Sequence, residues 1–176
     1  MIHPTRFAFA KRVSFGILTL AMICSPILAQ EPAGTSGGTT VLYVQTTSVL
    51  STNSQVFAPI SGLTFSLPAA SSSAKFATIT LSMPNLYLTA GTPGQTAGAG
   101  IGILLNGSLV ALGQISGDVA VGTTGATLDG RKPATVIVKV ALGSTPIAVD
   151  AAWAGTRNTT INSDTFASMS ALLTAK

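Results

Sequence analysis

The stretch that decides the fold reads Ala134-Thr-Val-Ile-Val-Lys-Val-Ala-Leu142, then Gly143-Ser-Thr-Pro146, then Ile147-Ala-Val-Asp-Ala-Ala-Trp153. Apolar residues recur at every second position of both long runs, which is the pattern of a strand that buries one face. The short link predicts that the two strands pair as a hairpin. In that arrangement Asp150 faces outward and pairs with Lys139 across the hairpin.

Shorter runs with the same alternation lie on both sides of this stretch, bounded by Pro, Gly and Asn residues. The expected strands cover residues 41–44, 63–67, 75–83, 101–105, 108–112, 119–121 and 166–173, with 86–88 as a continuation or a loop anchor. Asn106-Gly107 predicts a type I′ hairpin turn, because both residues accept positive φ. No apolar set keeps helical spacing. The sequence therefore predicts an all-β fold, a two-sheet antiparallel sandwich that is jelly-roll-like, with an immunoglobulin-like order as the alternative.

The N-terminus has the layout of a secretory signal peptide. Three basic residues precede an apolar run over 15–24, and Ala29 supplies a small residue at the cleavage site. That run is shorter than the ~20 residues of a membrane span. We expect residues 1–29 to be removed, residues 30–40 to form a flexible leader and residues 41–176 to form one β-sandwich domain.

This cleavage would change the chemistry that remains. It removes His3 and Cys24, the only histidine and the only cysteine, and three of the nine Lys and Arg residues, so the net charge falls from +4 to about +1. Disulfides, thiolate catalysis, a serine–histidine pair and histidine-ligated zinc or copper are then excluded. The remaining cations are scattered and form no stripe for nucleic acid. We expect no enzyme, no cofactor, no nucleic-acid partner and no transmembrane span after cleavage.

Several features together resemble the C1q/TNF-like jelly roll. They are the order of short strands, the run Leu63-Thr-Phe-Ser-Leu67, the central Asn106-Gly107 hairpin and the closing run Phe166-Ala-Ser-Met-Ser-Ala-Leu-Leu173. The resemblance covers most of residues 41–176. It implies a compact, often trimeric recognition or surface module without catalytic residues. Low charge and apolar residues at outward positions, such as Phe76 and Ile137, also favour a homo-oligomer.

Three motif-like features have plainer explanations. Gly34-x-Ser36-x-Gly38 matches a nucleophile motif by letters but has no histidine base. Gly98-Ala-Gly100 resembles part of a dinucleotide loop, yet no helix follows, so a flexible loop is expected. The acids Asp118, Asp129, Asp150 and Asp164 lie in separate segments and are expected at the surface. A loop Ca²⁺ site or an Asp-only hydrolase remains an alternative.

The candidate ligand-binding residues are Asn85, Tyr87, Trp153, Arg157 and Asn158. Asn85 with Tyr87, and Arg157 with Asn158, are polar and aromatic groups of the type that hold carbohydrate. Trp153 is either a core residue or a platform on which a sugar or partner stacks. The loops expected to present a ligand site are Gly91–Gly100, Gly122–Lys132 and Gly155–Ser163.

These observations predict an exported, non-catalytic β-sandwich module that binds a glycan or protein. Its expected location is the periplasm, the cell surface or the extracellular space, and its expected state is a homo-oligomer, with a trimer favoured. The alternative is a structural subunit of a surface layer or fibre.

Overall fold

The computed structural model describes residues 39–89, 96–118 and 127–176, which form ten β-strands and no helix. The strands are β1 (Thr40–Gln45), β2 (Leu50–Thr52), β3 (Ala58–Leu67), β4 (Phe76–Thr89), β5 (Thr96–Leu105), β6 (Ser108–Asp118), β7 (Thr127–Ala141), β8 (Ile147–Thr156), β9 (Thr160–Ser163) and β10 (Ser168–Thr174). The expected signal peptide, most of the leader and the expected strand at 119–121 lie outside the described residues. Among the described residues no helix has the length and hydrophobicity that a membrane span requires.

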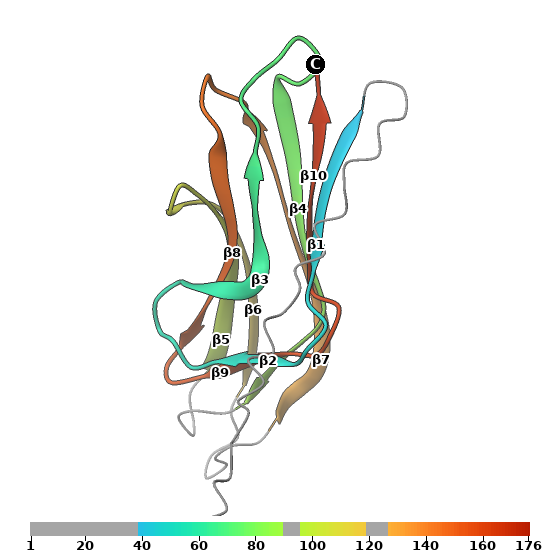
Figure 1. Cartoon of the computed structure of the whole chain (residues 1–176). Helices are drawn as coiled ribbons and strands as arrows, with labels where there is room; N and C mark the ends of the chain where they lie inside the picture. The colour runs from blue at the N-terminus through green and yellow to red at the C-terminus, as the bar shows by residue number, and fades with distance from the viewer. Residues whose placement is uncertain (1–38, 90–95, 119–126) are drawn as a thin grey trace, which may run out of the picture.

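The strands form two antiparallel sheets that pack face to face (Figure 1). The β4 sheet has the order β1-β10-β4-β9-β2, with β7 on the other side of β4, and the β5 sheet has the order β3-β8-β5-β6. Antiparallel pairs are nested along the chain: β1 with β10, β3 with β8, β4 with β7 and β5 with β6. These pairs alternate between the two sheets, as in a long hairpin rolled into a jelly roll. The predicted two-sheet, jelly-roll-like sandwich is confirmed.

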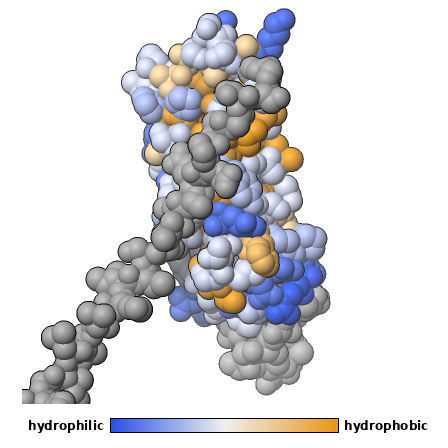
Figure 2. Space-filling view, turned by 45° about the vertical axis from the view of Figure 1, so that its right-hand side comes forward, coloured by the Kyte–Doolittle hydropathy of each residue, from blue (hydrophilic) through white to orange (hydrophobic). Residues whose placement is uncertain are grey.

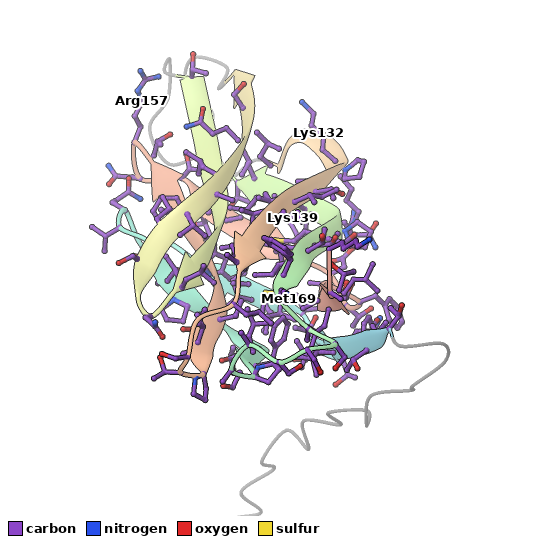
Figure 3. All side chains as sticks on the ribbon, turned by 90° about the horizontal axis from the view of Figure 1, so that it is seen from above. Lys132, Lys139, Arg157 and Met169 are labelled. Atoms are coloured by element: carbon purple, nitrogen blue, oxygen red, sulfur yellow. The ribbon has the colours of Figure 1, made fainter. Side chains whose placement is uncertain are left out.

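The core lies between the two sheets and is formed by the alternating residues. On β4 the predicted inward set Ala77, Ile79, Leu81 and Met83 is fully buried. Seen from above, Met169 lies between the sheets (Figure 3), and it is also fully buried. Burial of one such side chain contributes about 1.5–3 kcal/mol, so the alternating strands supply most of the driving force for folding.

The predicted hairpin turn is present between β5 and β6. Asn106 has φ 48° and Gly107 has φ 79°, the two positive values that a type I′ turn requires. Asn106 also ties the turn to β8: its side-chain oxygen accepts a hydrogen bond of 3.0 Å from the Ala148 amide. Short-range turn chemistry therefore predicted this element correctly.

The predicted hairpin between the two central strands is wrong. β7 pairs with β4, whereas β8 pairs with β3 and β5, so the link after β7 crosses from one sheet to the other. Asp150 consequently lies opposite Thr64 and Leu104 instead of Lys139. The Lys139 ammonium lies 4.8 Å from the centre of the Phe76 ring. A strand shows the same alternation of apolar and polar residues whichever of the two sheets it belongs to. The alternation therefore could not identify which strand each of these two strands pairs with.

Two boundaries near the C-terminus also differ from prediction. The last strand begins at Ser168 instead of Phe166, which is exposed and has φ 77°. Phe166 falls out of phase with the buried residues of β10, so it lies in the preceding turn. The segment expected as the loop Gly155–Ser163 contains strand β9, in which Ile161 is fully buried. Similarly, residues 96–100 belong to β5 and residues 127–132 to β7.

Candidate functional site

The structure separates the predicted site residues into three places. Asn85 and Tyr87 lie on β4, Arg157 and Asn158 form the turn between β8 and β9, and Trp153 lies on β8 in the core. Only 3% of Trp153 is exposed, which agrees with the core alternative for this residue. Two surface regions therefore remain as candidates, one on each sheet.

The first region, here called the aromatic cluster, consists of Asn85, Tyr87, Arg131 and Asp164. Tyr87 lies between buried Leu86 and Leu88, so its ring is on the outer side of the β4 sheet. The Arg131 guanidinium carbon is 4.9 Å from the centre of the Tyr87 ring, and Arg131 also forms an ion pair with Asp164. The Asp164 amide donates a hydrogen bond of 3.3 Å to the Asn85 carbonyl oxygen. The strand pairing thus brings Tyr87 and Arg131 together from β4 and β7.

The charges of this cluster are accessible to solvent. Asp164 raises the pKa of the Arg131 guanidinium, mainly through their hydrogen bond and secondly through charge attraction. The side chains of Arg131 and Asp164 are 55% and 27% exposed, so water competes with the pair and its contribution to stability is small. The same groups can exchange hydrogen bonds with a ligand at little loss to the fold.

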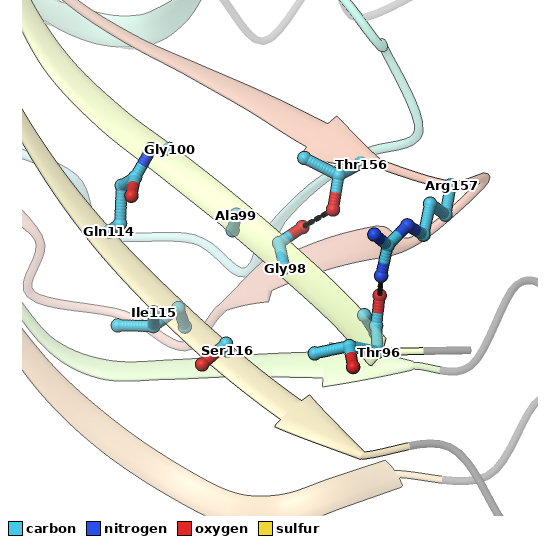
Figure 4. Close-up of a pocket in the computed structure, with 10 residues that line it drawn as sticks. Thr96, Gly98, Ala99, Gly100, Gln114, Ile115, Ser116, Thr156 and Arg157 are labelled. Carbon is cyan, nitrogen blue, oxygen red and sulfur yellow. Dashed lines mark hydrogen bonds between the residues drawn. The ribbon is translucent and has the colours of Figure 1, made fainter.

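The second region is a groove on the outer side of the β5 sheet, here called the glycine groove. It is a cavity of about 420 Å³ at one end of β5, β6 and β8 (Figure 4). Its lining residues are Thr96, Ala97, Gly98, Ala99, Gly100, Gln114, Ile115, Ser116, Thr156 and Arg157. Among the residues that the structure describes, this lining contains hydroxyl, amide and guanidinium groups and no carboxylate. The groove therefore offers hydrogen bonds to a neutral or anionic ligand.

Glycines create the floor of the groove. Gly98 and Gly100 lie on the outer side of β5, alternating with buried Ala97, Ala99 and Ile101. A Cβ atom at Gly98 would lie 3.0 Å from the Thr156 hydroxyl, and one at Gly100 would lie 2.9 Å from the Phe57 ring. Any side chain at these positions would fill the cavity. Glycine in a strand is less stable than alanine by about 0.5–1 kcal/mol, so the open floor has an energetic cost.

Arg157 is fixed at the mouth of the groove by the turn between β8 and β9. Arg157 and Asn158 have φ values of 50° and 62°, and the Arg157 guanidinium donates a hydrogen bond of 2.8 Å to the Thr96 carbonyl oxygen (Figure 4). The Thr156 hydroxyl donates to the Gly98 carbonyl oxygen at 3.3 Å. The Asn158 amide donates to the Gln55 side-chain oxygen at 3.0 Å. Of the predicted residues, Arg157 lines the groove and Asn158 supports the turn.

Most residues of the glycine groove are not among the predicted site residues, and neither are Arg131 and Asp164 of the aromatic cluster. Gln114, Ser116 and Thr156 join the groove only because β5, β6 and β8 are neighbours, and that order was not predictable from alternation. The prediction of a loop at Gly98 and Gly100 is wrong, because both residues belong to β5, and their spacing of two fits one face of a strand. Nothing in the sequence around Arg131 indicates its contacts with Tyr87 and Asp164, which come from other strands and turns. In one copy of the protein the two regions lie on opposite outer faces, because they belong to different sheets.

The β4 sheet also carries exposed apolar side chains. Val41, Ile137 and Leu172 are 41%, 63% and 40% exposed. Val41 pairs with Leu172, which in turn pairs with Thr78 on β4, and Ile137 pairs with Thr80. Figure 2, which turns this side of the molecule forward, shows orange apolar surface in its upper half. We call the three exposed side chains of Val41, Ile137 and Leu172 together the apolar face.

Comparison with known proteins gives one family match and weak structural likenesses. The family model described as "Bc2l-C, N-terminal domain" matches residues 42–172. No curated protein matches the sequence. A solved structure of dimeric latent PorU from Porphyromonas gingivalis is similar over 74% of this chain, at 11% identity and a TM-score of 0.38, and the chain spans 13% of that protein. CBM35 from Cellvibrio japonicus Abf62 is similar over 85% of this chain and 80% of its own, at 11% identity and a TM-score of 0.24. Scores this low carry no functional argument.

Proposed function

The chain belongs to the Bc2l-C N-terminal domain family, and from this membership we propose that it is a non-catalytic, lectin-like module that binds a glycan in the glycine groove. We also propose that it acts after export, at the cell surface or outside the cell, as expected from residues 1–29. The observation that carries the proposal is the groove itself, with its glycine floor and its wall of uncharged hydrogen-bonding groups around one arginine.

The chemistry of the groove suits a sugar ring. A sugar presents several hydroxyl groups that donate and accept, and Gln114, Ser116 and Thr156 do the same. The glycine floor lets a ring approach the β5 backbone closely. A neutral hydrogen bond contributes about 0.5–1.5 kcal/mol net, so three or four of them correspond to a dissociation constant of about a millimolar for one sugar. Tight binding by such a site requires several copies acting together.

Self-association would supply these copies. We propose that the protein forms a homo-oligomer through the apolar face, with a trimer favoured by the resemblance to C1q/TNF-like domains. This face contains exposed Ile137 and Leu172, and the nearby Lys139 ammonium is held over an aromatic ring. The aromatic cluster lies on the same sheet, so assembly through this sheet would place the cluster beside a neighbouring copy.

The experiment is a glycan array on the purified protein, followed by calorimetry with the glycan that binds best. Gln114→Ala should weaken binding about 5-fold, because one neutral hydrogen bond is lost. Arg157→Ala should weaken it about 10-fold or more, because a charged donor is lost. Lys139→Ala, on the other sheet, is the matched control and should leave the affinity of a single site unchanged. An array without signal, or equal binding by Gln114→Ala, would contradict the proposal.

The apolar face also favours a second candidate, a structural subunit of a surface layer or fibre. In a closed oligomer every copy of the associating surface is buried, so assembly stops at a fixed size. An open, head-to-tail contact leaves a free surface at each end, so the assembly continues to grow. Light scattering on the purified protein separates the two: a defined small mass supports the glycan-binding module, and open-ended growth supports the fibre.

A further inference from the structure

Three lysines gather around one aromatic ring at an end of the β4 sheet. Lys75 directly precedes Phe76, and the Lys139 ammonium lies 4.8 Å from the centre of the Phe76 ring. Lys176 follows Thr174, the residue of β10 that pairs with Phe76, by two positions. All three lysines are exposed to solvent. We call Lys75, Lys139 and Lys176 together the lysine end.

Backbone pairing holds these lysines at one end of the folded domain. The Lys75 amide donates a hydrogen bond of 2.7 Å to the Thr174 carbonyl oxygen, and the Leu142 amide donates one of 2.8 Å to the Lys75 carbonyl oxygen. Lys75 therefore continues the pairing of β4 with the chain on both of its sides. Lys139 lies on β7 opposite Thr78 of β4, and the aromatic ring contacts its ammonium group.

The acids of the described residues lie away from the lysine end. Asp150 is on the outer side of the β5 sheet, between fully buried Val149 and Ala151. The other three are at the opposite end of the strands, where β4 ends and β5 begins; they are Asp118, Asp129 and Asp164. The α-carboxyl group of Lys176 offsets one charge at most. The lysine end therefore remains positive and attracts anions.

The chain enters the domain beside the lysine end. Thr40, the first residue of β1, pairs with Leu173, next to the end of β10 (Figure 1). Residues 25–39 link this point to the apolar run over 15–24, which we expect to direct export through a membrane. A fully extended link of this length reaches about 50 Å at most. The lysine end therefore stays within this distance of the bilayer while the apolar run is inserted.

From this charge and this position we propose that the lysine end docks on an anionic membrane surface, where its ammonium groups contact the phosphates of the lipid head groups. One lysine near such a surface raises binding about 5-fold, so three lysines raise it about 100-fold. The outer faces of both sheets stay accessible in this orientation. The docking does not depend on the proposed glycan site, because the glycine groove lies at the other end of the β5 strand.

The proposed homo-oligomer would strengthen this docking. Copies related by rotation about an axis along the strands present their lysine ends on the same side. All of these ends would then contact one membrane, and their combined binding would exceed that of a single copy.

The test is sedimentation of the purified protein with lipid vesicles. One set of vesicles contains about a third phosphatidylglycerol, which is anionic, and the other contains only phosphatidylcholine, which has no net charge. The readout is the ratio of the two binding constants, because an apolar N-terminal segment would contribute equally to both. The unmodified protein should bind the anionic vesicles about 100-fold more tightly. About 0.5 M salt should remove most of this preference, because it shortens the screening length to about 4 Å.

Lys139→Gln and Lys132→Gln form the matched comparison, since both remove a lysine of β7, at opposite ends of the domain. Lys139→Gln should reduce the ratio about 5-fold, whereas Lys132→Gln should leave it unchanged. The triple change Lys75→Gln, Lys139→Gln and Lys176→Gln should bring the ratio close to one.

Equal binding to both sets of vesicles by the unmodified protein, or equal effects of Lys139→Gln and Lys132→Gln, would overturn the proposal. Displacement of the vesicles by inorganic phosphate or by an acidic polysaccharide, at equal ionic strength and equal concentration of negative charge, would overturn it as well. The lysine end would in that case bind free anions in preference to a membrane surface.

Discussion

At the scale of single residues, the glycines decide which parts of the surface stay open. Gly98 and Gly100 keep side chains away from the outer side of β5, and the cavity exists where those side chains would be. Gly107 serves a different purpose, because its φ of 79° is a conformation that L side chains rarely adopt. One residue type therefore opens a binding surface in one place and permits a turn in another.

Comparing substitutions at Gly107 and Gly143 distinguishes the effect of backbone conformation from the effect of steric room for a side chain. A Cβ atom at either position meets nothing within 4 Å, but only Gly107 has a positive φ. Gly107→Ala should lower the free energy of unfolding by about 1–2 kcal/mol, the cost of the left-handed region. Gly143→Ala should be neutral or slightly stabilising. Denaturant titration of both variants is the measurement, and equal effects would contradict this role of the turn.

At the scale of elements, the sequence predicted which residues face the core far better than which strands are neighbours. Val149 on β8 is fully buried and Val136 on β7 nearly so, as alternation indicated. Yet the hairpin between these two strands was wrong, since pairing order depends on how distant parts of the chain meet. The glycine groove was missed for the same reason, because its walls come from three strands that only the rolled topology makes adjacent. The aromatic cluster was predicted in part, through Asn85 and Tyr87. Arg131 was not predicted as part of it, because this residue belongs to β7, which is distant in sequence from Tyr87.

The junction of β8 and β9 is packed so closely that it tolerates no added atom. A Cβ atom at Gly155 would overlap the Thr159 carbonyl oxygen, which belongs to the backbone and cannot rotate away. Gly155→Ala should therefore lower the free energy of unfolding by about 1–3 kcal/mol, as overpacking does. Ala148→Gly, at an exposed position of the same strand, is a control that should lower it by about 0.5–1 kcal/mol. Thermal and denaturant unfolding measure both changes, and an unaffected Gly155→Ala protein would refute the close packing at this junction.

At the scale of the whole molecule, the two sheets have different outer faces. The β4 sheet carries the apolar face and the aromatic cluster, while the β5 sheet carries the glycine groove. This division suits a protein that associates through one side and leaves the other free for a ligand. The resemblance to C1q/TNF-like domains implies a module of this type, and the jelly-roll-like sandwich is the part of that expectation that the structure confirms. The sequence could not indicate where the groove lies, because no single strand contains it.

If copies of the protein associate through the apolar face, a charge placed on this face should lower the molecular mass measured in solution. Ile137→Glu places a charge on the exposed centre of β7, and burying that charge between copies would be strongly unfavourable. The variant should be a monomer in light scattering, while the unmodified protein is a small oligomer. Val110→Glu, on the β5 sheet, is a matched control with a 42% exposed valine and should keep the oligomer. A monomeric unmodified protein, or an oligomer that survives Ile137→Glu, would exclude assembly through this face.

The central claim, that a glycan occupies the glycine groove, is tested most directly by nuclear magnetic resonance. The backbone amide signals of the protein are followed while the best array glycan is added to saturation. We predict that the largest shifts occur at Gly98, Gly100, Thr156 and Arg157, whose backbone lines the groove. Saturating binding that leaves these four amides unmoved would contradict the account.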